Sequence, residues 1–186
     1  MHSLTRLPDD LPVPADDGAC GHLPGKKLPA LSLSATHGEF IDISVHTGWL
    51  VIYCYPMTGR PDRELPDNWD AIPGARGCTP QACAFRDRYR EITDHNVLMY
   101  GLSTQTTAYQ LEAKQRLHLP FELLSDHNLA FANALKLPLF EVDNQRLIKR
   151  LTLIALDGII KKIFYPVFPP DTNASQVIEW LDIYKT

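Results

Sequence analysis

The sequence of 186 residues lacks an apolar run long enough for a membrane helix, and it lacks a strong excess of charge of either sign. A membrane-spanning helix needs about 18 consecutive apolar residues, and no run reaches that length. The formal net charge is −4, which argues against a nucleic-acid binder that works through a broad basic field. The same value is too small to indicate an acidic disordered tail.

The N-terminus lacks the basic start and the apolar stretch of a secretory signal, so we expect a cytoplasmic protein. In that compartment thiols stay reduced, and a close pair of cysteines is more often catalytic or metal-binding than a static disulfide. Internal repeats and low-complexity segments are also absent. The proportions of 45% apolar and 22% charged residues are ordinary for a globular protein, and the length favours one domain.

Proline, aspartate and glycine are concentrated in residues 1–28, which show no periodic pattern. We interpret this segment as an arm that lies over the domain or is partly disordered, and residues 29–186 as the single domain. Within the domain, residues 57–77 form an insertion without a regular pattern. A connection this long inside a compact domain is usually functional.

The pattern of apolar residues predicts an α/β fold. The run Trp49–Tyr55 is typical of a central strand covered on both faces, and residues 29–45 are typical of a β-hairpin. Asp157-Gly158 is a strong signal for a second hairpin. Alternating strands and helices favour a parallel sheet with antiparallel edges, an order that resembles the thioredoxin-like fold. The remaining strands are expected at residues 96–103, 121–124, 150–156 and 159–164, and helices at residues 79–92, 107–117, 126–136 and 174–184.

Caps are predicted for three of these helices. Thr107 and Gln110 have the spacing of a capping box, Asp126 precedes the helix that ends near Lys136, and Asn173 precedes the last helix.

Cys78 is the candidate nucleophile, because it follows a glycine at the start of a predicted helix. The free N–H groups and the dipole of a helix N-terminus favour a thiolate, and Arg76 adds positive charge nearby. Cys83 lies five residues later, where the helical rise of about 7.5 Å exceeds the reach of a static disulfide. A transient disulfide could form when the first turn unwinds; the alternatives are a structural thiol at Cys78 and simple packing of Cys83 against Ala82 and Phe85.

The other cysteines carry weaker signals. Cys54 lies within the central strand, as a small buried hydrophobe would. Cys20 is either an incidental thiol or the distant partner of a disulfide. A zinc site is not expected, because Cys78 and Cys83 lack the Cys-x-x-Cys spacing and no histidine is near them in sequence.

Arg150 begins the expected strand at residues 150–156 and is either a solvated charge or a functional group. In a thiol peroxidase its planar fork of donors would hold a peroxide and stabilise the thiolate. Arg86 and Arg76 compete for this role.

At these residues the sequence resembles the peroxiredoxins, and most closely the branch called PrxQ or bacterioferritin-comigratory protein, within the AhpC/TSA superfamily. The motif Gly-Cys-Thr-x-x-Ala-Cys-x-x-Arg-Asp of that branch matches residues 77–87. The resemblance spans residues 29–185. It implies that Cys78 is the peroxidatic cysteine, Cys83 the resolving cysteine and Arg150 the arginine beside the thiol. Further matches are a polar position at Gln81 and the segments 52–56, 101–104, 123–126 and 150–158, and we add Gly77 and Arg76 as candidate substrate contacts.

One feature departs from the family pattern, in which a proline and a threonine stand seven and three residues before the nucleophile. Here those positions are Ala71 and Ala75. Thr58, which follows the strand in the order Pro56-Met57-Thr58, is the first candidate to supply the missing hydroxyl. Thr79 is the second.

The resemblance implies a thiol-dependent peroxidase that reduces hydrogen peroxide or organic hydroperoxides. Cys78 would become a sulfenic acid, condense with Cys83 to a disulfide and be recycled by thioredoxin or a similar dithiol. It implies no metal, flavin or haem, no nucleic acid, no membrane, and a monomer or homodimer. The alternatives are a thiol–disulfide oxidoreductase and a non-catalytic thioredoxin-like binding domain whose insertion recognises a partner.

Overall fold

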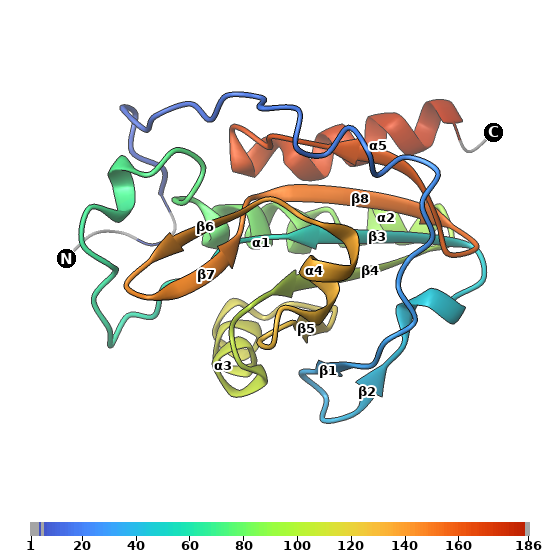
Figure 1. Cartoon of the computed structure of the whole chain (residues 1–186), viewed down its shortest axis with the longest axis horizontal. Helices are drawn as coiled ribbons and strands as arrows, with labels where there is room; N and C mark the ends of the chain where they lie inside the picture. Colours follow the sequence, from blue (N-terminus) through green and yellow to red (C-terminus); the bar gives the residue numbers. More distant parts are fainter. Residues whose placement is uncertain (1–3, 5, 185–186) are drawn as a thin grey trace.

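A mixed sheet of seven strands forms the centre of the protein in the computed structural model (Figure 1), which describes residue 4 and residues 6–184. The strand order is β2-β1-β5-β4-β3-β8-β9. β3 pairs in parallel with β4 and antiparallel with β8, so it occupies the middle of the sheet as the sequence predicted. The strands are β1 (Leu33–Ala35), β2 (Phe40–Ile41), β3 (Trp49–Cys54), β4 (Val97–Ser103), β5 (Leu123–Ser125), β8 (Leu151–Leu156) and β9 (Ile159–Phe164).

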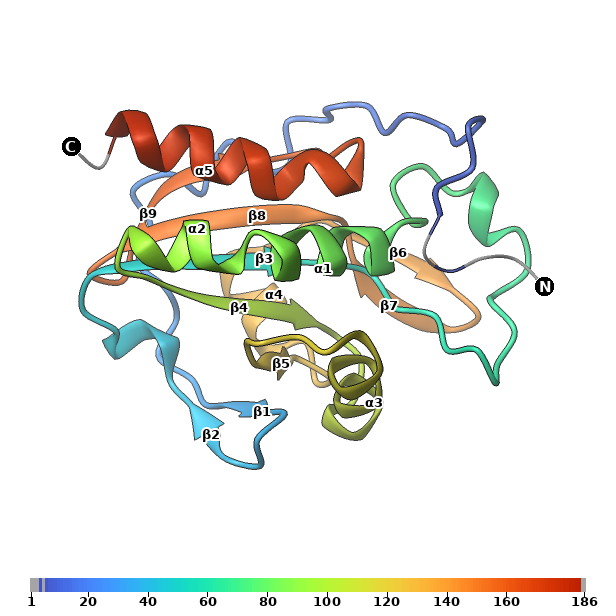
Figure 2. The same ribbon diagram turned by 180° about the vertical axis from the view of Figure 1, so that it is seen from behind.

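Helices cover both faces of this sheet, as in thioredoxin-like proteins. Figure 2 shows α1 (Cys78–Asp87), α2 (Tyr89–Asp94) and α5 (Asn173–Tyr184) together on one face. α4 (Ala130–Leu135) packs against the opposite face, and α3 (Thr107–Leu117) packs beside β5. Alternate residues of β3 therefore enter two separate cores, Val51 and Tyr53 on the α1 side and Leu50 and Ile52 on the α4 side.

The arm lies against the sheet from Cys20 onward. Leu23 and Leu28 are buried in the core on the α4 side. The backbone N–H groups of Gly25 and Leu28 donate to the carbonyl oxygens of Ile160 and Gly158, each at 2.8 Å. This second half of the arm is thus tied to the hairpin of β8 and β9. Residues 1–3 and 5 of the predicted arm lie outside the described residues.

The two predicted hairpins are confirmed. β1 and β2 pair around Gly38, and β8 and β9 pair around Asp157 and Gly158, both of which have positive φ. A third hairpin, which the sequence did not predict, is formed by β6 (Leu139–Val142) and β7 (Gln145–Ile148) as a separate two-stranded sheet. Its turn residues Asp143 and Asn144 also have positive φ.

Two of the predicted caps are wrong. Thr106, not Thr107, caps α3, because its hydroxyl accepts from the N–H of Tyr109. Gln110 is buried and donates to the carbonyl oxygen of Leu124 at 2.8 Å, so it serves the core and not a capping box. Asn173 lies inside the first turn of α5, and its side chain turns to the sheet.

The helix expected from Asp126 begins only at Ala130, and its N-cap residue is Leu129, but Asp126 bonds to its first turn as a cap would. Its carboxylate accepts from the N–H groups of Phe131 and Ala132, at 2.8 and 2.9 Å. The helix expected over residues 79–92 is divided into α1 and α2, because the backbone leaves helical geometry at Arg88 (φ −106°, ψ 13°).

The described part of the chain contains no helix that is long and apolar enough to cross a membrane. Residues 56–77 are mostly irregular, as expected, with one 3₁₀ turn at Trp69–Ala71. Trp69 is buried there against Phe140 of β6, with ring centroids 6.1 Å apart. The missed hairpin therefore supports the insertion.

Candidate active site

Cys78 is the first residue of α1 and is only 3% exposed. Gly77 precedes it with φ 104°, a conformation that glycine adopts at little cost and that turns the insertion into the helix. A Cβ atom at Gly77 would overlap Cγ of Pro170 and lie 2.9 Å from Cδ2 of Leu7. The thiol thus stands at a helix N-terminus, as predicted, on a turn that only glycine fits.

The side chain of Arg150 contacts the sulfur of Cys78. This arginine immediately precedes β8, whose first residue Leu151 pairs with Cys54 at the end of β3. Its Nη2 atom lies 3.2 Å from Sγ of Cys78, and the side chain is only 3% exposed. Sγ also lies 3.6 Å from the carbonyl oxygen of Ala75. The arginine predicted for this position is therefore next to the thiol.

Neutral acceptors fix the guanidinium of Arg150. Nη2 also donates to the carbonyl oxygens of Ala75 and Arg76, at 3.1 Å each. Nη1 donates to the side-chain oxygen of Gln81. In the described part of the chain no carboxylate forms an ion pair with this buried cation. The positive charge of Arg150 can therefore stabilise a negative charge on the Cys78 sulfur.

A polar network behind Gln81 holds this arrangement in place. Gln81 is fully buried, and its amide nitrogen donates to Oδ1 of Asn173 at 3.0 Å. The same oxygen accepts from the hydroxyl of Thr152 at 2.7 Å. Gln81 therefore contacts both Arg150 and Asn173, and it holds the guanidinium in place. A substrate contact at Gln81 stays a prediction. Asn173 was missed as part of the site, because its partners are far away in sequence.

The two rival arginines are directed elsewhere. Arg76 forms an ion pair with Asp70 at 3.2 Å. Arg86 pairs with Asp87 at 2.8 Å and donates to the carbonyl oxygen of Leu117. Of the three candidates, Arg150 is the one that contacts the Cys78 sulfur.

Cys83 lies on the same helix as Cys78 and is free, half-buried among the side chains of the α1 core. Burial raises the pKa of its thiol above the ordinary value of 9.0, against the opposing effect of Arg86. In this reduced form the two sulfurs are held by a regular helix. A disulfide between them requires the beginning of α1 to unwind.

The two threonines occupy different surroundings. The hydroxyl of Thr58 lies 3.1 Å from Oε1 of Gln105, which also accepts from the Thr58 N–H at 3.0 Å. Thr79 is buried in the first turn of α1, directly after Cys78. Within the described residues, the hydrogen bonds of the Cys78 sulfur go to Arg150 and Ala75.

The two remaining cysteines are buried and free. Cys54 lies in β3, as expected, and burial raises its pKa well above the usual value. Burial also raises the pKa of Cys20, to about 12. Both thiols are therefore poor nucleophiles at neutral pH.

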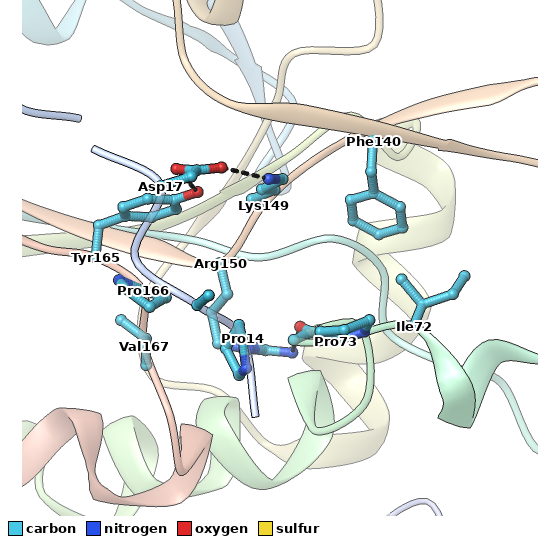
Figure 3. Close-up of a pocket in the computed structure, with 12 residues that line it drawn as sticks. Pro14, Asp17, Ile72, Pro73, Phe140, Lys149, Arg150, Tyr165, Pro166 and Val167 are labelled. Atoms are coloured by element: carbon cyan, nitrogen blue, oxygen red, sulfur yellow. Dashed lines mark hydrogen bonds and ion pairs between the residues drawn. The ribbon is translucent and has the colours of Figure 1, made fainter. Parts of the chain in front are cut away.

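A cavity of about 350 Å³ adjoins Arg150 (Figure 3). The arm, the insertion, β6 and the segment after β9 contribute its walls. Figure 3 shows the Arg150 side chain between Pro14 of the arm and Pro73 of the insertion. The cavity and the thiol therefore share one residue, Arg150.

Comparison with known proteins defines the class. The pattern of the Redoxin family matches residues 23–178. Peroxiredoxin Bcp of Bacillus subtilis is 32% identical over 111 residues, which cover 58% of this chain and 61% of that protein. A putative peroxiredoxin bcp of Coxiella burnetii is 28% identical over 162 residues, which cover 83% of this chain and 95% of that protein.

Solved structures agree on the fold. The crystal structure of peroxidoxin BcpB from Mycobacterium tuberculosis has a TM-score of 0.72 and 21% sequence identity, over 89% of this chain and 100% of that one.

The chain belongs to the Redoxin family. Within it, the chain is a peroxiredoxin of the PrxQ and Bcp type, and thus a thiol-dependent peroxidase that uses a peroxide and a thiol reductant.

Proposed function

We propose that Cys78 reduces hydrogen peroxide or an organic hydroperoxide and that Cys83 resolves the product. The observation that carries this assignment is the contact of 3.2 Å between Arg150 Nη2 and Cys78 Sγ at a helix N-terminus. A buried guanidinium and the helix dipole both stabilise negative charge on the sulfur. The thiolate is the form of cysteine that attacks.

In the first step the Cys78 thiolate attacks the terminal oxygen of the peroxide. An S–O bond forms and the O–O bond breaks, so the sulfur is oxidised by two electrons to a sulfenic acid. The leaving oxygen takes a proton and departs as water or an alcohol. Arg150 stabilises the charge that moves onto that oxygen, with donors that are already in place.

In the second step the start of α1 unwinds and the Cys83 thiolate attacks the sulfenic sulfur. The disulfide forms and water leaves. A dithiol, for which we propose thioredoxin, then restores both thiols by exchange. We place this cycle in the cytoplasm, in a monomer or a homodimer.

The remaining site residues support this chemistry in our proposal. Gln81 orients Arg150, and Gly77 sets the turn before the nucleophile. Thr79 is the better candidate for a hydroxyl beside the sulfur, because the hydroxyl of Thr58 is already engaged with Gln105. Arg76 adds positive charge near the path by which the peroxide approaches Cys78.

The decisive experiment compares peroxide consumption by the wild type, Cys78→Ser and Cys83→Ser in the presence of thioredoxin and its reductase. We expect Cys78→Ser to lose turnover entirely, because the serine hydroxyl is not an adequate nucleophile. Cys83→Ser should reduce one equivalent of peroxide and then stop. Cys54→Ser serves as the control thiol. Full activity of Cys78→Ser would refute the assignment.

The resolving step should depend steeply on pH. The pKa of Cys83 lies above its ordinary value, so its thiolate fraction rises about tenfold for each pH unit between pH 6 and pH 8. We expect the rate of disulfide formation after one addition of peroxide to rise in the same proportion. Rapid-quench thiol counting measures this rate. A rate that is constant over this range contradicts attack by the Cys83 thiolate as the limiting event.

A further inference from the structure

We propose that the first half of the arm, residues 6–17, is a latch that holds the beginning of α1 folded and thereby slows formation of the disulfide between Cys78 and Cys83. This inference rests on the proposed function and adds a control of its second step. The pattern of the Redoxin family begins at residue 23, so the latch lies outside the part of the chain that the family pattern matches.

The latch packs on the short segment that leads into α1. A Cβ atom at Gly77 would lie 2.9 Å from Cδ2 of Leu7, so this methyl group rests directly on the glycine backbone. Pro14 covers Gly74 in the same way, with its own Cβ 3.5 Å from a Cβ atom placed there. Figures 1 and 2 show this half of the arm (dark blue) beside the insertion (green). Residues 74–77 therefore cannot move outward without breaking contacts with the arm.

Arg150 holds the same segment by its carbonyl groups. Its Nη2 atom donates to the carbonyl oxygens of Gly74, Ala75 and Arg76, at 3.3, 3.1 and 3.1 Å. Gly77 then provides the N-cap of α1. When the first turn of α1 unwinds, the backbone at this cap has to change as well, because it is continuous with the turn. Unwinding therefore competes with the contact between Leu7 and the cap.

An ion pair ties the end of the latch to the body of the protein. The Asp17 carboxylate accepts from Lys149 Nζ and from the Tyr165 hydroxyl, at 2.8 Å each, as Figure 3 shows. The hydrogen bond from Lys149 is the main reason that the pKa of Asp17 falls to about 2. The carboxylate is therefore charged at neutral pH. Lys149 directly precedes Arg150, so the tether and the site share one short stretch of chain.

The latch matters because the sulfenic acid of Cys78 has two fates. It condenses with Cys83 and releases water, which requires the unwound form. In the folded form it instead attacks a second peroxide: a second S–O bond forms, the O–O bond breaks, water or an alcohol leaves, and the sulfur is oxidised to a sulfinic acid. The rate of the first fate is proportional to the population of the unwound form. A latch that lowers this population prolongs the life of the sulfenic acid.

Leu7→Ala tests the latch, and Val13→Ala, on an arm residue that is 68% exposed, is the matched control. We expect Leu7→Ala to form the disulfide about fivefold faster than the wild type, the effect of losing about half of a buried leucine's contribution. Leu7→Met conserves volume and should keep the wild-type rate, as should Val13→Ala. Rapid-quench thiol counting in the full chain, after one addition of peroxide, measures these rates.

Two further readouts separate a latch from general damage. The peroxide concentration that converts half of Cys78 to sulfinic acid, measured by mass spectrometry, should rise about fivefold in Leu7→Ala. It should do so because this concentration is set by the ratio of the two rates. The rate of the first oxidation of Cys78 should stay unchanged, because the sulfur keeps its contacts with Arg150 and Ala75.

Salt tests the tether independently of Leu7. Because salt screens an exposed ion pair, raising sodium chloride from about 0.05 to about 1 M should speed disulfide formation in the wild type about twofold. Asp17→Asn has no charge to screen, so it should be fast at both concentrations. Asp16→Asn is the matched control, because Asp16 accepts from the Gly18 N–H at 2.9 Å and forms no ion pair within the described residues, and it should respond as the wild type does.

The failures of this inference and of the proposed function are distinguishable. If the wild type forms the Cys78–Cys83 disulfide and Leu7→Ala forms it no faster, the latch is overturned and the proposed function stands. An equal gain in Val13→Ala, or a loss of the first oxidation step in Leu7→Ala, also overturns the latch. If the wild type consumes no peroxide, or forms no disulfide between these cysteines, the proposed function is refuted, and this inference with it.

Discussion

Replacing Arg150 by alanine should lower the rate constant for oxidation of Cys78 by peroxide about a thousandfold. Loss of one preorganised donor to a developing oxyanion typically costs about a hundred- to a thousandfold. Arg150 also provides a buried positive charge beside the sulfur, so we expect the upper end of that range. Single-turnover mixing with hydrogen peroxide, followed by counting of free thiols, gives the rate constant. Arg150→Lys should recover only part of the loss, because an ammonium group has no planar fork.

Two controls test whether Arg150 acts on the peroxide itself or only supports the thiol and the surrounding structure. Arg88→Ala removes an exposed arginine that pairs with Glu91, and it should change the rate less than threefold, an effect of a surface ion pair. Alkylation of Cys78 by iodoacetamide reports the reactivity of the thiol without a peroxide. If Arg150→Ala slows alkylation as much as peroxide reduction, the arginine does not act on the peroxide oxygens.

Replacing Gly77 by alanine should lower the free energy of unfolding by roughly 3 kcal/mol, from backbone strain and overpacking together. The residue has φ 104°, and a Cβ atom there would overlap Pro170. For a chain of this length that corresponds to a fall in Tm of about 10 °C. Peroxidase activity should fall as well, because relief of the overlap moves the start of α1 and separates Cys78 from Arg150.

Gly38→Ala is the matched control for this change. Gly38 has a similar φ of 96°, but a Cβ atom there would meet nothing within 4 Å. It should therefore show the backbone strain alone, about 1–2 kcal/mol. Thermal unfolding followed by circular dichroism measures both variants. Equal losses in the two would mean that the contact with Pro170 contributes nothing.

The sequence predicted those parts of the fold whose signals are local. The apolar run of β3 and the Asp157-Gly158 turn were sufficient for the central strand and its neighbouring hairpin. The hairpin of β6 and β7 was missed because its strands are short and its turn, Asp143-Asn144, lacks glycine. The choice between neighbouring threonines as the cap of α3 depends on backbone geometry that spacing alone does not determine.

For the candidate site, too, the sequence predicted the residues with local signals and missed those that only the fold brings together. Cys78 and Arg150 were predicted from their positions at a helix start and a strand start, with help from the family resemblance. The contact of Gln81 with Asn173 joins residues 92 positions apart, which no pattern in one sequence reveals. The cavity is still less predictable, because five separate segments of the chain form its walls.

The departure from helical geometry at Arg88, between α1 and α2, limits how much of the helical layer unwinds when Cys78 is oxidised. The proposed disulfide requires the first turns of α1 to lose their hydrogen bonds, whereas α2 begins a new ladder of its own after the break. Phe85, which stacks on Tyr53 with ring centroids 4.6 Å apart, anchors the end of α1 to the sheet. Each catalytic cycle would therefore be a confined order–disorder transition, and the layer of α2 and α5 would remain folded as a fixed platform for the returning helix.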